Sequence, residues 1–335
     1  MNNSTSLARS PKVFIIVLNW NNAPDTIDCL ESVFKLNSNN FQIVLCDNSS
    51  SDKSKDVILD HLVRHNHAVK RVGESELNSI KSPLEAEVII ISNQNNYGYA
   101  GGNNRGLRYA TSVGDQDGYA WIINNDTVLH PESLDGLLKE ASQKPEAGLF
   151  GSTILDFSKR DTIQTQGGDQ FYPWFGMSRH IGEGRKLEDQ LSQAVVESRM
   201  GYVVGASVFV RLSAVAKIGL MEEGYFLYFE EVDWATRARR MGIKIGYAPT
   251  SLVYHKEGST IGSSVFARRK SELADYYGIK NRLVMTRRLF RWALPTVYLA
   301  MVFTLVKRLL TGQFDRAWMV MKIMLGVDRR PIQPS

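Results

Sequence analysis

The sequence predicts an α/β fold: a three-layer α/β/α domain built on a mostly parallel central sheet, followed by C-terminal amphipathic helices. Three observations support this prediction. Apolar runs of strand length alternate with helical segments, polar residues follow these runs, and the balance of charge changes near residue 265. A chain of 335 residues is long enough for one large domain with such an appendage.

The alternation of elements extends through the first half of the chain. Buried strands are expected at 13–18, 42–46, 87–92, 119–123 and 148–155, with helices between them at 26–36, 57–63, 101–110 and 131–141. Strands and helices alternating at this spacing form a mostly parallel sheet covered on both faces. Further along, the sequence indicates loops or short antiparallel strands at 162–184, a strand at 203–211 and a helix at 231–241.

Polar residues follow the carboxyl ends of four expected strands. They are Asn19 to Asn21, Asp47 and Asn48, residues 93–104, and Asn124 to Asp126. In open α/β sheets ligands bind at this edge, so we expect the binding site there.

The basic charge of the protein belongs to its C-terminal part. Residues 265–335 carry 14 Lys and Arg against four Asp and Glu, whereas the rest of the chain is acidic. We therefore divide the chain into a disordered N-terminus (1–11), an α/β domain (12–264) and a basic helical segment (265–335) that associates with membrane or oligomerises as a homodimer. An acidic main domain argues against nucleic acid as a partner.

The expected location follows from the termini and the cysteines. Residues 292–306 lack charge but include Pro295, and 15 residues are fewer than the roughly 20 that a spanning helix needs. Interfacial helices are favoured, with packing on the domain or on a second subunit as the alternative. Cys29 and Cys46 form no ligand motif, and residues 1–11 show no signal peptide. We expect a cytoplasmic protein, peripheral on the cytosolic face of the plasma membrane.

The turn after the fourth strand is a candidate metal site. Asp126, supported by Asn124 and Asn125, can hold Mg²⁺ or Mn²⁺ against a diphosphate, because phosphates and water supply the remaining ligands. The alternative for Asp126 is an ordinary helix N-cap. His255, at the end of an apolar run, is a second candidate ligand or a structural histidine.

Three carboxylates crowd the start of the 231–241 helix. Glu230, Glu231 and Asp233 suit a general base for an acceptor hydroxyl, with neighbouring acids beside it. The alternative is charge complementarity to the helix dipole. The glycine-rich segment 93–106, which contains Asn103 and Arg105, can approach a phosphate or ribose, or be a turn without a ligand.

Taken together, these segments resemble family 2 glycosyltransferases, especially their rhamnosyltransferase-like branch, over residues 12–260. The resemblance rests on the opening residues 13–48, the segment 93–106, the turn 123–127, residues 204–210 with 225–240, and a late histidine at 255. It implies a GT-A type fold. The chain departs from the family at Asn124, where the first metal-turn acid is expected, and at Glu230-Glu231, where Glu-Asp is usual.

The resemblance also implies roles for single residues. Trp20 would stack on the nucleobase of a dTDP- or UDP-linked sugar and Asp47 would hydrogen-bond it, with Asn19, Asn103, Arg105 and Asn125 also on the donor side. Asp126 and His255 would bind the metal, and Glu231 would be the base, with Asp233 in reserve.

The implied reaction is an inverting transfer of a sugar, rhamnose among the options, to a glycan or lipid-linked glycan in cell-surface polysaccharide synthesis. A sugar-nucleotide nucleotidyltransferase and an inactive, membrane-recruited sugar-binding scaffold are the alternatives. A nucleotidyltransferase would normally carry a basic glycine-rich loop after its first strand, where this chain has Asn19 to Asn22.

Overall fold

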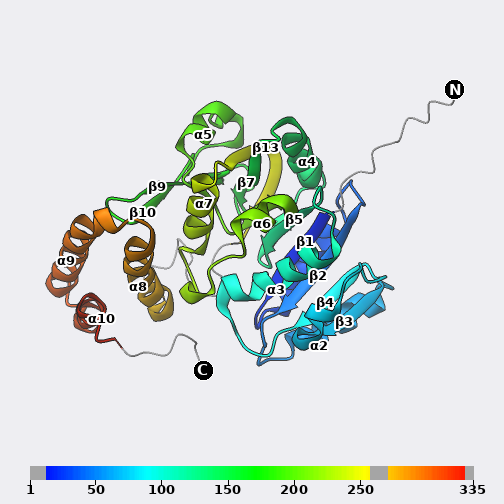
Figure 1. Cartoon of the computed structure of the whole chain (residues 1–335), viewed down its shortest axis with the longest axis horizontal. Coiled ribbons are helices and arrows are strands. Elements are labelled where there is room, and N and C mark those ends of the chain that lie inside the picture. Colours follow the sequence, from blue (N-terminus) through cyan, green and yellow to red (C-terminus); the bar gives the residue numbers. More distant parts are fainter. Residues whose placement is uncertain (1–12, 257–270, 329–335) are drawn as a thin grey trace.

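The computed structural model describes residues 13–256 and 271–328 and has one large sheet at its centre (Figure 1). The sheet has ten strands in the order β3-β4-β2-β1-β5-β12-β7-β13-β6, with β8 paired to β7. Its strands are β1 (Val13–Asn19), β2 (Phe41–Asp47), β3 (Val69–Gly73), β4 (Val88–Ser92), β5 (Tyr119–Asn124), β6 (Thr127–Leu129), β7 (Ala147–Asp156), β8 (Ile163–Gln166), β12 (Ser207–Arg211) and β13 (Lys244–His255). The N-terminus expected to be disordered and the domain boundary at 264 lie outside the described residues.

The sheet is mostly parallel, as the sequence predicts. Strands β1 to β5, β7 and β13 run in one direction, whereas β6, β8 and β12 run against their neighbours. Asn19 lies opposite Asp47, which lies opposite Ser92, and Leu18 lies opposite Asn124. The carboxyl ends of β1, β2, β4 and β5 therefore meet at one edge of the sheet.

Helices cover both faces of the sheet and complete the three layers. The helices are α1 (Ala23–Val33), α2 (Ser54–Arg64), α3 (Gly98–Val113), α4 (Ser133–Gln143), α5 (Gln193–Arg199), α6 (Leu212–Ile218), α7 (Glu230–Arg240), α8 (Glu272–Leu289), α9 (Leu294–Leu310) and α10 (Phe314–Leu325). Because successive side chains of a strand point to opposite faces, Phe14 and Ile16 of β1 belong to the apolar cluster under α3, α5, α6 and α7, whereas Ile15 and Val17 belong to the cluster under α1, α2 and α4.

The region after β7 contains the helices α5 and α6, which the sequence did not predict, and differs from the prediction at 203–211. A single strand at 203–211 is wrong, because β11 (Tyr202–Val203) and β12 belong to different sheets, with a turn at Gly205 between them. β11 joins a three-stranded antiparallel sheet with β9 (Gly168–Tyr172) and β10 (Met177–His180). The short antiparallel strands expected within 162–184 are confirmed.

The C-terminal helices α8, α9 and α10 pack on one another and on the loop before α7. Tyr277 of α8, Val297 and Met301 of α9 and Val320 of α10 share one apolar cluster with Phe226 of that loop. The C-terminal helices expected from the sequence are thus present, and α8 is part of the structure that surrounds α7 (Figure 1).

Candidate active site

A hydrogen-bond network orders the ends of β1 and β2. Nδ2 of Asn19 donates to Oδ1 of Asp47 at 2.9 Å and to the hydroxyls of Ser50 and Ser54 at 3.1 Å. The Ser50 hydroxyl also donates to Asp47, at 2.6 Å. Both Asn19 and Asp47 are buried, so these bonds fix the two side chains before any ligand arrives. Trp20 follows Asn19 at the same edge and is half-buried.

The network continues to the turn after β5 through Thr26 of α1. The Thr26 hydroxyl donates to Oδ1 of Asn19 at 2.8 Å and accepts from Nδ2 of Asn125 at 2.9 Å. Asn125 is thereby turned toward α1. The neighbouring carboxylate of Asp126 faces β13 instead, where the next contact lies.

Asp126 and His255 face each other across the edge of the sheet. Nε2 of His255 lies 3.2 Å from Oδ1 of Asp126. The amide of Gln164 fixes the imidazole, since its Nε2 donates to the backbone oxygen of His255 at 3.0 Å, which leaves its Oε1 to accept from Nδ1 at 3.0 Å. Nδ1 therefore carries the ring proton, and the Nε2 position directed at Asp126 is the one available to a proton or a cation.

This pair fits a divalent cation. A carboxylate oxygen and an imidazole nitrogen about 3 Å apart are spaced like adjacent ligands of one ion, and an outer hydrogen bond like that from Gln164 is usual for a metal-binding histidine. Mn²⁺ accepts both ligand types, while Mg²⁺ prefers oxygen.

Glu230 and Glu231 open α7 and differ in their surroundings. Glu230 is buried, and its Oε2 has no hydrogen-bond partner among the described residues. Burial, and next the charge of Glu231, raise the pKa of Glu230 well above its ordinary value, because both disfavour the charged form. Glu231 is partly exposed, and burial followed by the charge of Asp169 raises its pKa to about 7. Such a pKa suits a base that works near neutral pH.

The turn at Gly205 brings the Glu231 carboxylate to the sheet. A Cβ atom at position 205 would lie 2.2 Å from Oε1 of Glu231, so only glycine leaves room for this approach. The Tyr99 hydroxyl, which donates to the backbone oxygen of Gly205 at 2.7 Å, borders the same space. The backbone oxygen of Ala206 then accepts from the backbone nitrogen of Asn124 at 3.3 Å. Since Asp126 is two residues further, the structure brings Glu231, Asp126 and His255 to the same edge of the sheet.

The loop before α7 has an unusual backbone. Phe226, Tyr228 and Phe229 have φ angles of 63°, 68° and 76°, a region that bulky residues rarely adopt. Asn281 of α8 holds this loop, because its Nδ2 donates to the backbone oxygens of Tyr225 and Leu227 at 2.6 and 2.7 Å. Strain that is held in this way beside a candidate base is a common feature of active sites.

Asp233 lies one turn into α7 and is fully buried. Its carboxylate accepts from Nε of Arg237 at 2.6 Å and from the Tyr225 hydroxyl at 3.0 Å, and it pairs with Nε of Arg288 at 3.1 Å. With these partners Asp233 joins α7 to α8 and to the strained loop. The geometry therefore favours Glu231 over Asp233 as the base.

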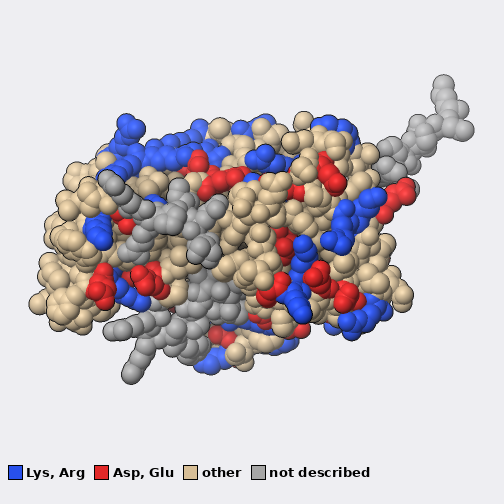
Figure 2. Space-filling model, turned by 90° about the horizontal axis from the view of Figure 1, so that it is seen from below, with Lys and Arg blue, Asp and Glu red and all other residues tan. Residues whose placement is uncertain are grey.

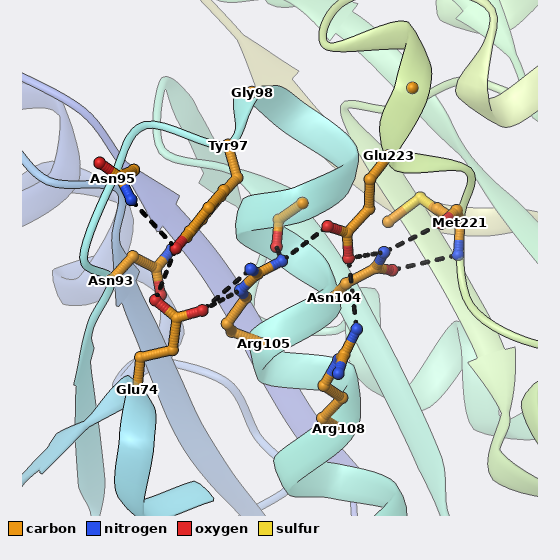
Figure 3. A network of polar contacts seen from close by, with 12 residues as sticks. Glu74, Asn93, Asn95, Tyr97, Gly98, Asn104, Arg105, Arg108, Met221 and Glu223 are labelled. Atoms are coloured by element: carbon orange, nitrogen blue, oxygen red, sulfur yellow. Dashed lines mark hydrogen bonds and ion pairs between the residues drawn. The ribbon is translucent and has the colours of Figure 1, made fainter. Parts of the chain in front are cut away.

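The glycine-rich segment 93–106 contacts the residues just before this loop (Figure 3). The Arg105 guanidinium pairs with Glu74 and Glu223, both at 2.9 Å, and lies 3.7 Å from the centroid of the Tyr97 ring. Asn104 donates to the Met221 backbone oxygen and to Glu223 at 2.9 Å. Arg105, expected on the donor side, is thus held between η1 (Glu74–Ser79) and the residues before the loop (Figure 3).

Asn103 points into the interior. Its Nδ2 donates to the Tyr99 backbone oxygen at 3.0 Å, while its Oδ1 has no partner within the part of the chain that the structure describes. It is fully buried, so the free oxygen costs stability unless water or a ligand reaches it.

Sequence reasoning missed several residues of this site. Asp169 of β9, which raises the pKa of Glu231, accepts from Tyr202 at 2.8 Å and lies 2.7 Å from Nδ1 of His180. Gln164 and Asn281 were also not foreseen. Gln164 and Asn281 contact residues more than 50 positions away, and Asp169 acts electrostatically on the equally distant Glu231, so no local pattern reports these interactions.

Comparisons with known sequences agree over most of the chain. The sequence model of glycosyl transferase family 2 matches residues 14–201, and that of glycosyl transferase family group 2 matches residues 120–327. An N-acetylglucosaminyl-diphospho-decaprenol L-rhamnosyltransferase of Mycobacterium tuberculosis is 27% identical over 185 residues, which cover 50% of this chain and 58% of the relative. The match thus spans little more than half of that protein. The low-salt glycan biosynthesis hexosyltransferase Agl10 of Haloferax volcanii is 22% identical over 249 residues, covering 74% of this chain and 73% of Agl10.

Solved structures share the fold. The mannosyltransferase PcManGT from Pyrobaculum calidifontis, in complex with GDP-Man and Mn²⁺, has a TM-score of 0.55 at 13% identity. The match covers 96% of this chain and 88% of PcManGT. GalNAc-T7 with UDP, GalNAc and Mn²⁺ has a TM-score of 0.55 at 14% identity, and the match covers 74% of this chain and 44% of GalNAc-T7. The expected GT-A type arrangement is confirmed.

Proposed function

Because this chain belongs to glycosyl transferase family 2, we propose that it is an inverting glycosyltransferase that moves a sugar from a nucleoside diphosphate to a glycan or a lipid-linked glycan. One observation carries the proposal: a carboxyl with a raised pKa, Glu231, shares a sheet edge with Asp126 and His255. The curated relatives, a rhamnosyltransferase and a hexosyltransferase, support glycosyl transfer in the synthesis of cell-surface glycans and make L-rhamnose the first sugar to test.

The donor would bind over the ends of β1 and β2. Trp20 would stack on the nucleobase, uracil or thymine, and Asp47 would accept a hydrogen bond from it. Asn19 and the serines around it hold the Asp47 carboxylate in place, so little order has to be gained on binding.

Glu231 would act as the base. Its carboxylate takes the proton of an acceptor hydroxyl as that oxygen attacks the anomeric carbon. The bond from this carbon to the diphosphate breaks on the opposite face, so the anomeric configuration inverts and the diphosphate leaves with the bonding electrons. Glu230 would lie beside Glu231 as a buried neighbouring acid, and Asp233 would keep α7 in position.

Asp126 and His255 would hold Mg²⁺ or Mn²⁺, with Asn125 ordering the turn. The bound cation would neutralise charge on the departing diphosphate. We place the protein in the cytoplasm, peripheral on the cytosolic face of the plasma membrane, where a lipid-linked acceptor is presented. Formation of a homodimer is the alternative role of the C-terminal helices.

A panel of dTDP- and UDP-linked sugars tests the donor. Thermal unfolding is measured with each compound, with and without Mn²⁺, because a ligand that binds the folded state raises its stability. We expect one donor to raise the melting temperature, and to do so more strongly with Mn²⁺. If no nucleotide sugar stabilises the protein and none is consumed, the proposed function is wrong.

The base is tested by Glu231→Gln. This change keeps the shape of the side chain but removes the proton acceptor, so transfer of the radiolabelled sugar should fall by about 10²–10⁴-fold. Calorimetry should show unchanged binding of the donor found in the panel. Equal loss of transfer and donor binding would remove Glu231 from the role of base.

A further inference from the structure

The hairpin between β9 and β10 ends in a cluster of exposed apolar side chains. Tyr172, Trp174, Phe175 and Met177 are between 38% and 54% exposed. Large aromatic residues gathered on a surface loop cost solubility and usually mark a contact with a partner or a membrane.

Several contacts hold this tip against the C-terminal helices. The Trp174 ring meets the Trp292 ring edge to face at 4.4 Å between centroids. The Thr296 hydroxyl donates to the Trp174 backbone oxygen, and Nε of Arg282 donates to that of Phe175 at 2.7 Å. The hairpin therefore extends the surface of η4 (Arg291–Ala293) and α9.

Helix α9 continues this surface with an exposed apolar stripe. Leu299, Phe303, Val306 and Leu310 recur at helical spacing, and Phe303 and Leu310 are 72% and 83% exposed. Phe314 and Trp318 are exposed on the next helix, α10. Figure 2 shows the end of the molecule formed by these helices with wide areas free of charged side chains.

We propose that the tip of the β9–β10 hairpin and the outer faces of α9 and α10 form a single surface, the docking surface, that lies in the headgroup region of an anionic bilayer. Trp and Tyr side chains prefer this region, where the ring is partly buried and its N–H or O–H group stays hydrated. The inference rests on the proposed function only in assigning a lipid-linked acceptor.

The structure favours a helix that lies on the bilayer. By length and composition, residues 291–310 are apolar enough to cross a membrane, with a mean hydropathy of 1.5. However, the inner face of α9, with Val297 and Met301, is buried against α8 and α10. The faces of α9 that α8 and α10 do not cover are left for lipid, as in an interfacial helix.

Charge favours a bilayer over a second copy of the chain. Arg287 and Arg291 precede α9 and Lys307 lies in its last turn, and all three are exposed. In a symmetric dimer the same surface meets itself, so these cations would come close to one another. Anionic headgroups complement them instead.

The docking surface would also orient the site. β9 and β10 run from the tip to Asp169 and His180, and Asp169 acts electrostatically on Glu231. The small sheet thus connects the bilayer to the proposed base, along the path by which a lipid-linked acceptor would approach.

Sedimentation with vesicles tests the proposal. The full chain is mixed with vesicles of phosphatidylcholine alone or of equal parts phosphatidylcholine and phosphatidylglycerol. The variants are Trp174→Ala/Phe175→Ala on the hairpin and Phe303→Ala/Leu310→Ala on α9. Val57→Ala/Val63→Ala, which removes two exposed apolar side chains from α2, is the matched control.

We expect the chain to bind the anionic vesicles more tightly, and both test variants to bind them about tenfold more weakly or worse. The control should bind like the parent. If the hairpin variant binds anionic vesicles as tightly as the parent, the proposal is wrong. It is also wrong if light scattering shows a dimer that does not bind vesicles and that the hairpin variant dissociates. Thermal unfolding verifies that each variant folds. The assay needs no donor sugar, so failure of the proposed transfer would leave its result intact.

Discussion

At the scale of single residues, Glu231 must be ionised to act as a base, although its side chain is partly buried. Burial and Asp169 both oppose its ionisation, and the resulting pKa of about 7 makes it a stronger base than an ordinary glutamate. The buried carboxylate of Asp169 is itself held by the Tyr202 hydroxyl. A residue of the three-stranded sheet therefore tunes a residue of α7.

The pH dependence of kcat/KM should report this tuning. Glu231 must be deprotonated to accept a proton, so kcat/KM should rise with pH through about 7 and level off above. Asp169→Asn removes a negative charge that raises the pKa of Glu231, so the midpoint should move to lower pH. Asp161→Asn, an exposed change on a neighbouring loop, should not move it. An unchanged midpoint in Asp169→Asn would contradict the assignment.

His255→Ala should weaken metal binding more than nucleotide binding. The change removes a nitrogen ligand and leaves the Asp126 carboxylate, so Mn²⁺ affinity should fall by about 10–100-fold or more, since even outer-shell changes cost that much. Titration of Mn²⁺ followed by electron paramagnetic resonance, in the presence of UDP, gives the affinity. His67→Ala, between α2 and β3, is the control. Equal Mn²⁺ affinity in parent and His255→Ala would exclude His255 as a ligand.

At the scale of elements, α8 acts as a support for the loop that delivers Glu231. Three residues of this loop have left-handed φ angles, and each such residue costs about 1–3 kcal/mol. Contacts from two sides offset this cost. The backbone nitrogen of Tyr99 donates to the backbone oxygen of Phe226 at 2.8 Å, and Asn281 binds the loop from α8. A Cβ at Gly98 would lie 2.0 Å from that same oxygen of Phe226, so α3 approaches the loop as closely as glycine allows.

Asn281→Ala should release the loop. It removes a buried donor from at least two carbonyl oxygens, so unfolding free energy should fall by about 1–3 kcal/mol. Since Asn281 positions the loop and touches no reactant, kcat should fall while nucleotide affinity stays the same. Denaturant unfolding, steady-state kinetics and calorimetry measure the three quantities. Val284→Ala, exposed on the same helix, should change none of them. A variant that loses stability but keeps full kcat would show that Asn281 is only structural.

The elements that the sequence predicts well are those with strong local patterns. β1, β2, β4 and β5 are continuous apolar runs, and their polar ends could be assigned to one edge because parallel strands must end together. β3 was missed because Lys70 and Arg71 are exposed on this edge strand, which leaves too few apolar residues for a signal. The break at Gly205 was missed because the apolar residues on both sides of it, 202–204 and 208–210, look like one continuous strand in the sequence.

The candidate site divides in the same way. The local sequence context marks three of these residues. Asp126 lies in a polar turn, His255 at the end of a strand and Glu231 at the start of a helix. The contacts of Asp233 and Arg105 involve partners elsewhere in the chain, Arg288 for Asp233 and Glu74 and Glu223 for Arg105. Ion pairs of that kind follow only from the folded arrangement.

At the scale of the whole molecule, charge and apolar surface separate by region. The described C-terminal helices carry the exposed apolar stripe, while the edge of the sheet with Asp47, Asp126 and Glu231 is acidic. Not every Lys or Arg side chain of these helices is available to lipid headgroups. Arg308 and Arg316 pair with Asp275, and Arg288 pairs with Asp233 and Glu222. Three exposed basic side chains near α9 form no ion pair among the described residues and can contact headgroups. They are Arg287, Arg291 and Lys307.

Attachment to a bilayer should therefore have an electrostatic part and an apolar part that respond differently to salt. Each basic residue near an anionic surface contributes about 1 kcal/mol, and salt screens this attraction, whereas burial of aromatic side chains is nearly independent of moderate salt. Arg287→Gln/Arg291→Gln/Lys307→Gln should weaken binding to anionic vesicles by about a hundredfold at low ionic strength and flatten its salt dependence. Lys70→Gln/Arg71→Gln, on the exposed edge strand β3, should keep the parent's salt dependence. If both charge variants respond to salt alike, the attraction comes from the net charge of the protein and these three residues do not face the bilayer.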